Sequence, residues 1–349
     1  MHRRTAALAS LLLAAQPHAF ALRRRGAEAA PAAGPNYARR VDVTAAALAF
    51  AEMHALEPDW VQAQLAQARY VPAVAQLMMP PASPSARNWT AYRARMVDAR
   101  RIEAGRQWWS DNQAWLDAAE QRWAVPAEIV VGIVGVETYY GRVTGTFRVL
   151  DALATLSFDF PTGRSDRSPF FRAELGHFLR LARRESWDPT AVKGSYAGAM
   201  GLPQFMPSSV LNFAVDLDGD GRVDLYGSAA DVAGSVAHYL AEHGWRPQMP
   251  THYPVEPPPS TLERALLLVP DVVPTFSPEQ MAARGATLGE AAQQHLGPLA
   301  LIELFNGDTG PRGYLAGTQN FYALTRYNAS SYYALAVIQL GRAVAEARG

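Results

Sequence analysis

The chain of 349 residues contains no cysteine, and only one of its 32 basic residues, Lys193, is a lysine. Without cysteine, a disulfide scaffold, thiolate metal ligation, a cysteine nucleophile and a lipid-modified N-terminal cysteine are all excluded. The 32 basic residues balance 32 acidic ones, so the charge pattern of a nucleic-acid-binding protein is missing. The sequence also lacks a G-x-S-x-G elbow, a phosphate-binding loop and a histidine pair with zinc spacing.

The first 21 residues have the pattern of an export signal. A basic start at residues 2–4 precedes a small apolar run over residues 6–15, and Ala-Phe-Ala at residues 19–21 is a small-x-small cleavage pattern. Ten apolar residues are too few to span a bilayer. A disordered Ala/Arg-rich leader is the alternative. We expect residues 1–21 to be a signal peptide and the protein to be periplasmic, with no transmembrane anchor and, lacking cysteine, not a lipoprotein.

Apolar periodicity divides the rest of the chain into regions. Residues 22–40 are rich in Arg, Ala, Gly and Pro and are expected to be a disordered tether. Helical spacing then predicts an N-terminal helical domain over 41–120 and a second helical region over 121–245. Prolines cluster in residues 246–310, which we expect to form a small inserted β-containing subdomain, and residues 311–349 return to helix.

The clearest predicted helix begins at Pro126, has a largely apolar sequence and ends at Gly141. Further helices are expected over residues 150–156, 171–181, 231–240 and 332–347. In contrast, Leu266–Val269 together with Val272 and Val273 favours short strands. The predicted fold class is therefore mainly α, with a small β part (α+β).

Glu137 lies in the segment G-V-E-T-Y-Y-G at residues 135–141, at the end of this apolar helix. Burying a carboxylate there costs several kcal/mol unless it is paired or protonated. Desolvation raises the pKa of a carboxylic acid, as a general acid working near neutral pH requires. A solvated glutamate at a frayed helix end is the alternative, and the residues alone do not decide between the two.

A second segment, K-G-S-Y-A-G-A-M-G-L-P-Q-F-M-P-S at residues 193–208, mixes small residues with hydrogen-bonding ones. Small residues let the backbone approach another surface closely, and Ser195 and Gln204 supply polar groups that suit a sugar-binding groove. A tight helix–helix crossing would also explain the glycines, although it explains Gln204 less well.

The third segment is D-L-D-G-D-G-R-V-D at residues 216–224. Oxygen ligands at positions 1, 3 and 5, glycine at 6 and a β-branched residue at 8 are typical of an EF-hand calcium loop. Position 12 is Gly227, so a further ligand must come from elsewhere, and Asp231 is the nearest candidate. The alternative is an acidic turn without an ion, but clustered carboxylates repel one another without a cation. One such loop indicates structural calcium rather than a sensor.

Together these segments, with V-L-D-A-L-A-T-L-S-F-D-F-P, H-Y-L-A-E-H-G-W and R-Y-N, resemble the lytic murein transglycosylase B family (glycoside hydrolase family 103). The resemblance runs from about residue 45 to the C-terminus. It implies a lysozyme-like helical catalytic core over 121–245, completed by residues 311–349. It also implies an EF-hand-like calcium loop over 216–231 and no organic cofactor.

The resemblance further implies an enzyme of cell-wall turnover, a lyase. Such enzymes cleave the β-1,4 bond between N-acetylmuramic acid and N-acetylglucosamine in peptidoglycan and leave 1,6-anhydromuramic acid ends. The expected partners are peptidoglycan glycan strands, and proteins of cell-wall synthesis are possible partners. We expect a monomer that binds no nucleic acid.

The resemblance also assigns roles to individual residues. Glu137 is implied as the single catalytic acid and base. The implied substrate-binding residues are Ser195, Gln204, Tyr239, Tyr327, Asn328 and Arg164. The implied calcium ligands are Asp216, Asp218, Asp220, Arg222 through its carbonyl, and Asp231.

Two other functions compete with this one. A muramidase (lysozyme-type hydrolase) on the same fold would use water and a second acid such as Asp151 or Asp159, since ordinary glycosidases need two carboxylates. A non-catalytic peptidoglycan-binding protein is the other alternative, which the Glu137 segment disfavours.

Overall fold

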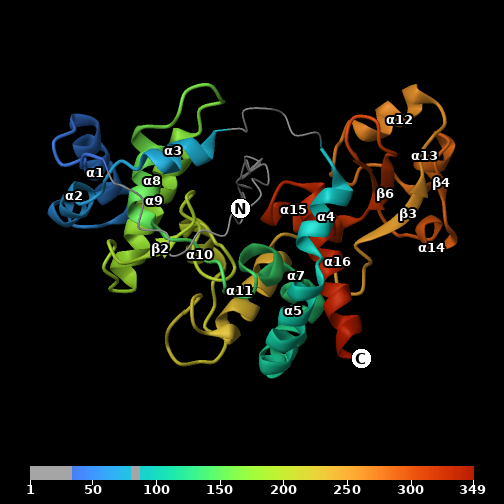
Figure 1. Cartoon of the computed structure of the whole chain (residues 1–349), viewed down its shortest axis with the longest axis horizontal. Coiled ribbons are helices and arrows are strands. Elements are labelled where there is room, and N and C mark those ends of the chain that lie inside the picture. The colour runs from blue at the N-terminus through green and yellow to red at the C-terminus, as the bar shows by residue number, and fades with distance from the viewer. Residues whose placement is uncertain (1–33, 80–86) are drawn as a thin grey trace, which may run out of the picture. The chain divides into compact units, whose positions relative to one another are not determined.

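The computed structural model describes residues 34–79 and 87–349, which are mostly helical with one small four-stranded sheet (Figure 1). The expected signal peptide and most of the expected tether lie outside the described residues. The described chain divides into two compact units. We call residues 34–79, 99–239 and 341–349 the helical unit, and residues 87–98 and 240–340 the sheet unit.

The helical unit contains the three segments that the sequence singles out. Its helices are α1 (Val41–His54), α2 (Pro58–Ala66), α3 (Pro72–Met78), α5 (Ala99–Asp111), α6 (Gln113–Trp123), α7 (Ala127–Thr138), α8 (Val149–Phe158), α9 (Ser168–Arg184), α10 (Pro207–Phe213), most of α11 (Ala229–Glu242) and the end of α16 (Ser331–Arg348). Two short antiparallel strands, β1 (Phe147–Arg148) and β2 (Lys193–Gly194), complete it. Expected helices 150–156, 171–181 and 231–240 are confirmed within α8, α9 and α11.

The sheet unit is built on an antiparallel sheet with strand order β4-β3-β6-β5. Its strands are β3 (His252–Glu256), β4 (Thr287–Leu288), β5 (Ala300–Leu304) and β6 (Gly313–Gly317), and its helices are α4 (Trp89–Met96), α12 (Thr261–Leu268), α13 (Pro278–Ala283), α14 (Glu290–Gln293), α15 (Gln319–Tyr327) and the first part of α16. Expected helix 332–347 is confirmed in α16. Strand β6 lies beyond the expected boundary of the β subdomain at residue 310.

The prediction of strands around residues 266–273 is wrong, because residues 261–268 form helix α12. The Ser260 hydroxyl caps this helix by accepting a hydrogen bond from the Glu263 backbone N–H at 3.4 Å. Leu267 is fully buried in the small core of the sheet unit. The cap and a run of three leucines, which are good helix formers, outweigh the β-branched residues that follow.

Buried polar residues join the two ends of the segment that carries the sheet. Residues 252 and 317 are paired across β3 and β6, and the Thr318 hydroxyl donates to the Pro250 carbonyl at 2.6 Å. Asn320 is fully buried; its amide donates to the carbonyls of Arg246 and Met249, both at 2.8 Å. The chain therefore enters and leaves this subdomain at neighbouring points.

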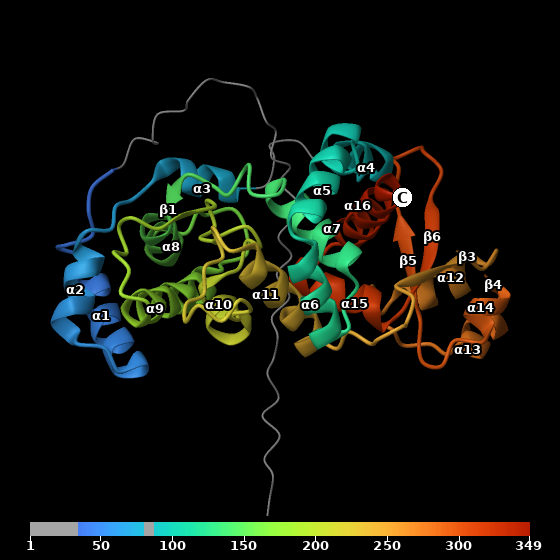
Figure 2. The same cartoon turned by 90° about the horizontal axis from the view of Figure 1, so that it is seen from below.

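Three polar side chains in α8 and at its C-cap, spaced four residues apart, hold the N-terminal part of the helical unit. Asp151 accepts from the Arg69 backbone N–H at 2.9 Å, and the Thr155 hydroxyl accepts from the Val71 N–H at 3.0 Å. Asp159 binds both Tyr37 (2.6 Å) and Arg40 (2.7 Å). Asp151 and Thr155 share one face of α8, because they are four residues apart in the helix. Figure 2 shows α8 beside α9, the helix it packs against.

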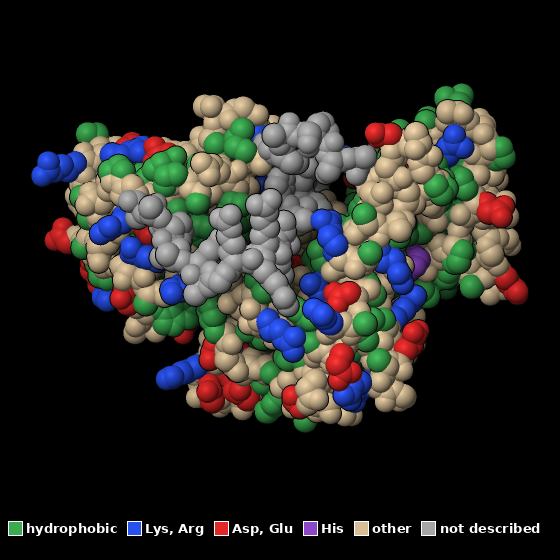
Figure 3. All heavy atoms as spheres, in the orientation of Figure 1, with side chains coloured by type: hydrophobic (Ala, Val, Ile, Leu, Met, Phe, Trp, Pro, Cys, Tyr) green, Lys and Arg blue, Asp and Glu red, His purple; other side chains and the backbone are tan. Residues whose placement is uncertain are grey.

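Basic and acidic side chains are interspersed on the face drawn in Figure 3, in keeping with their equal numbers in the sequence. Among the described residues, no helix combines the length and the apolar character that crossing a bilayer requires.

The Thr155 contact generates a stability prediction. Thr155→Val keeps the shape of a fully buried side chain but leaves the Val71 N–H without its acceptor. We expect the free energy of unfolding to fall by about 1–3 kcal/mol, measured as a lower urea midpoint at unchanged m-value.

Thr44→Val is the matched control for Thr155→Val. The Thr44 hydroxyl donates to the Arg40 carbonyl, which also accepts the Thr44 backbone N–H. Its loss therefore leaves no orphaned group, and we expect a change within about 0.5 kcal/mol. Equal destabilisation by the two substitutions would contradict the role assigned to Thr155.

Candidate active site

Glu137 lies in the last turn of α7, an otherwise buried helix. Residues 127 and 129–135 are all buried, whereas Val136 and Glu137 are partly exposed. Glu137 is therefore half-buried, which lies between the buried acid and the solvated glutamate that the sequence left open. The helix is anchored at its start by Glu120, which accepts the Ala127 N–H at 2.9 Å. A long apolar helix thus delivers one carboxylate to the point where the helix emerges from the core.

After Thr138, the last residue of α7, the chain turns through three consecutive residues with positive φ. The φ values of Tyr139, Tyr140 and Gly141 are 52°, 56° and 83°. Tyr139, not Gly141 as predicted, is the C-cap of α7. A left-handed conformation in a residue other than glycine costs on the order of 1–3 kcal/mol, and such strain clusters at functional sites.

Aromatic and basic residues surround this turn. The guanidinium groups of Arg101 and Arg142 lie 4.9 and 4.7 Å from the centroid of the Tyr139 ring. The Tyr140 ring stacks on Trp108 at 5.9 Å. Cation–π contacts and ring stacking both hold the rings in place. The sequence analysis missed Arg101 and Trp108, because helix α5 carries them outside any of the motifs.

Side-chain hydrogen bonds tie the end of α7 to the segment 193–208. The Thr138 hydroxyl donates to the Leu202 carbonyl at 3.0 Å and accepts from the Gly141 N–H at 3.1 Å. The Gln204 amide donates to the Thr144 carbonyl at 3.1 Å, from a backbone that is itself left-handed (φ 52°). Two segments about sixty residues apart in the sequence therefore form one structure beside Glu137.

The Ser195 and Tyr239 side chains contact other residues inside this structure. The Ser195 hydroxyl, in a residue that is 8% exposed, accepts hydrogen bonds from the N–H groups of Ala197 (3.2 Å) and Ala199 (3.0 Å). The Tyr239 ring packs on Phe205 and Phe213, with centroids 5.5 and 5.0 Å away. Their implied roles as substrate-binding residues stay predictions.

Arg164 belongs to a cationic cluster beside the segment 193–208. Its guanidinium donates to the Met78 carbonyl and lies 5.9 Å from the centroid of Phe160. Burial, with Arg164 close by, lowers the pKa of Arg167. Burial also raises the pKa of Tyr196, which the two arginines partly offset. The implied role of Arg164 in substrate binding also stays a prediction.

The last two implied substrate residues, Tyr327 and Asn328, belong to the sheet unit. The Tyr327 ring stacks on Tyr333 with centroids 6.3 Å apart and planes 15° apart. Asn328 ends helix α15. Both residues make these contacts within the sheet unit, and their implied roles in substrate binding stay predictions.

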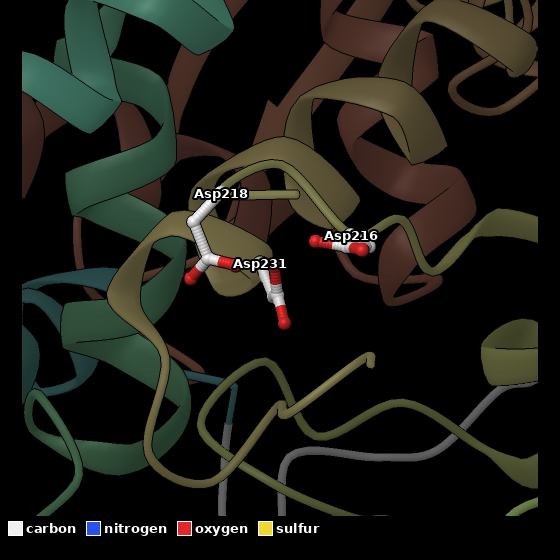
Figure 4. A group of neighbouring side chains, drawn as sticks. All are labelled: Asp216, Asp218 and Asp231. Carbon is white, nitrogen blue, oxygen red and sulfur yellow. The ribbon is translucent and has the colours of Figure 1, made fainter. Parts of the chain in front are cut away.

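Three carboxylates of the acidic loop converge at one point (Figure 4). Oxygens of Asp216, Asp218 and Asp231 all lie within 4.8 Å of one another. Burial raises the pKa of Asp231, although N–H groups of Asp224 and Leu217 lower it, and Asp218 and Asp216 raise it further. Hard carboxylate oxygens at such distances fit calcium, and a cation would offset their repulsion.

The other implied ligands of this loop lie outside that group of three. Asp220 accepts the Arg222 N–H at 2.8 Å, so this carboxylate stabilises the loop backbone. Gly219 and Gly221 both have positive φ, 75° and 88°, which lets the loop fold tightly around its centre.

The acidic loop supports the segment 193–208 directly. The Leu202 N–H donates to the Leu225 carbonyl at 2.8 Å, and the Tyr226 hydroxyl donates to the Lys193 carbonyl at 2.7 Å. The three segments that the sequence singled out thus form one connected structure.

Comparisons with known proteins agree on one family. The sequence profile described as "Transglycosylase SLT domain" matches residues 42–342. The chain is 41% identical to membrane-bound lytic murein transglycosylase B of Escherichia coli (strain K12), over 84% of this chain and 80% of that protein.

Solved structures of two relatives have the same fold. The soluble lytic transglycosylase SltB1 of Pseudomonas aeruginosa has a TM-score of 0.78 at 38% identity, covering 88% of this chain and 99% of that one. The Escherichia coli lytic transglycosylase SLT35 in complex with calcium has a TM-score of 0.76 at 38% identity, covering 90% and 96%. The mainly helical, lysozyme-like fold is confirmed, and the chain belongs to the transglycosylase SLT domain family.

Proposed function

We propose that the protein is a periplasmic lytic transglycosylase, which cleaves peptidoglycan between N-acetylmuramic acid and N-acetylglucosamine and leaves 1,6-anhydromuramic acid ends. Family membership supports the activity. The observation that carries the assignment to residues is the junction at the end of α7. Residues 135–145 and 193–208, which Thr138 and Gln204 tie together, contain one carboxylate between them, Glu137.

The alternative of a water-using muramidase needs a second acid, and the two candidates for it serve other purposes. Asp151 accepts the Arg69 N–H and lies 3.4 Å from Arg148. Asp159 accepts two hydrogen bonds from Arg40 and one from Tyr37. Both carboxylates anchor the N-terminal residues, which favours a reaction that uses one carboxylate.

One carboxylate suffices if the substrate supplies the second group. In the proposed reaction Glu137 gives its proton to the glycosidic oxygen, and the bond from this oxygen to C1 of the muramic residue breaks. The acetamido oxygen of the same sugar stabilises the positive charge at C1. The Glu137 carboxylate then takes the proton of the 6-hydroxyl, whose oxygen bonds to C1. This attack is intramolecular, so its effective concentration is far above that of bulk water.

Glu137→Gln tests this role. The amide cannot donate and regain a proton, so we expect release of anhydro-muropeptides from purified cell walls to fall by about 10²–10⁴-fold, measured by chromatography with mass spectrometry. The thermal midpoint should stay close to that of the parent protein, because residue 137 is only half-buried.

Glu128→Gln, in the first turn of the same helix, is the control and should keep its activity. Loss of less than about tenfold in Glu137→Gln would contradict the assignment of this residue. Products that carry an added water in place of the anhydro ring would contradict the reaction itself.

We also propose that Asp216, Asp218 and Asp231 bind calcium, together with Asp220 and the Arg222 carbonyl. The convergence of the first three supports this, as does the calcium complex of a relative. When bound, calcium would neutralise the carboxylates and fix the loop that contacts Leu202 and Lys193. Its role would be structural.

Calcium should therefore raise the thermal midpoint of the protein, and a chelator should reverse the rise. At a hundredfold excess over the dissociation constant the stabilisation is about 2.7 kcal/mol, which corresponds to roughly 5–10 °C. Asp218→Asn should remove most of this response in a melting experiment at fixed pH. Asp117→Asn, on the exposed face of α6, should not. A response that Asp218→Asn leaves intact would place any calcium elsewhere.

A further inference from the structure

The helical unit has a surface pocket of about 470 Å³ that lies outside the three segments. Residues from the N-terminal part, from β1 and from the turn before β2 line it: Asn36, Ala66, Gln67, Arg69, Arg148 and Thr190. All but Ala66 have polar or charged side chains. A volume of this size suits a small organic ligand, and the lining is rich in hydrogen-bond donors.

The Arg148 side chain, which lines this pocket, is only weakly paired. Its Nη1 atom lies 3.4 Å from Asp151, which is longer than a strong charge-assisted hydrogen bond. Its Nε atom is buried and has no hydrogen-bond partner in the described part of the chain. Because Nε is closed to solvent, a ligand would meet the accessible part of this side chain, which is 28% exposed.

Arg69 contributes a second guanidinium. Its backbone N–H is held by Asp151 at 2.9 Å and its backbone pairs with Asn36, so the position of the residue is fixed. Its side chain is exposed and makes no hydrogen bond or ion pair with the residues that the structure describes. Its guanidinium acts on Asp151 through charge alone, so its hydrogen-bond donors are open to a ligand.

Lys193, the one lysine of the chain, extends this cationic surface. In the β1–β2 pair Lys193 is directly opposite Arg148, and opposite residues in an antiparallel pair share a face. Two carboxylates balance part of the charge. Asp151 accepts the Arg69 N–H, and Asp188 accepts from the N–H and hydroxyl of Thr190. The surface therefore carries three cations (Arg69, Arg148 and Lys193) and two anions (Asp151 and Asp188), which leaves a net positive charge.

We propose that this pocket binds a carboxylate of a peptidoglycan stem peptide. This rests on the proposed function, because an enzyme that works on peptidoglycan meets peptide arms with free carboxylates beside the glycan strand. Guanidinium groups bind carboxylates through paired hydrogen bonds. The amides of Asn36 and Gln67 can both donate and accept, which suits a peptide backbone. Since Lys193 precedes Ser195, an occupied pocket adjoins the segment that reaches Glu137.

Binding can be measured without turnover. The probe is the free tetrapeptide L-Ala-D-Glu-diaminopimelate-D-Ala, titrated calorimetrically into the full-length Glu137→Gln protein. We expect the dissociation constant to rise at least about tenfold when Arg69→Gln and Arg148→Gln are added. Adding Arg106→Gln and Arg183→Gln, which remove two exposed arginines of the same unit, should change nothing. Arg69→Gln alone should also weaken binding, because this side chain makes no hydrogen bond or ion pair with the described residues.

Three results would overturn the proposal. They are equal binding by the parent and pocket variants, equal binding of the tetrapeptide with all its carboxylates amidated, and binding of inorganic phosphate without binding of the peptide. A kinetic comparison on otherwise wild-type protein adds a fourth. The pocket variants should raise KM for glycan strands that carry peptides but not for strands stripped of them by an amidase, and an equal rise on both would contradict the inference.

These outcomes separate the inference from the proposed function. Peptide binding is measured on a protein that cannot turn over, so absent transglycosylase activity would leave the binding result standing. Conversely, a pocket that ignores the peptide would leave the reaction at Glu137 untouched.

Discussion

The Thr138 hydroxyl makes the contact on which the arrangement around Glu137 depends. It lies one residue beyond the acid, donates to the Leu202 carbonyl and accepts from the Gly141 N–H. A Cβ atom at Gly141 would come within 3.3 Å of the Leu202 side chain, so the two segments already touch there. The strained turn persists because these contacts and the rings of Tyr139 and Tyr140 determine it from several sides.

The acidic loop extends the same structure by one more layer. It contacts the segment 193–208 through Leu225 and Tyr226, while α7 contacts the segment through Thr138. A cation in the loop would therefore act on the position of Leu202, two residues from Gln204. The stability of the loop and the geometry around Glu137 are therefore coupled.

The sequence predicted most of this site, because its signals are local. A carboxylate after an apolar helix, and oxygen ligands at fixed spacing, can be recognised without the fold. Asp231 does lie close to Asp216 and Asp218, while their role as calcium ligands stays a prediction. The contributions of Arg101 and Trp108 could not be predicted, since they depend on how α5 packs. Helix α12 was mistaken for strands because a leucine run among prolines carries little periodicity, and its cap at Ser260 was overlooked.

The hydrogen bonds of Thr318 and Asn320, which join the two ends of the segment that carries the sheet, have a consequence for how such a chain can evolve. Because residues 252 and 317 are paired neighbours, the gap that the subdomain bridges stays short whatever its size. Lengthening a connection whose ends are already fixed adds little closure entropy. Insertions within residues 252–317 can thus accumulate at little entropic cost, except around Phe305 and Asn306, which bond to Trp89, Thr90 and Tyr332 outside the segment.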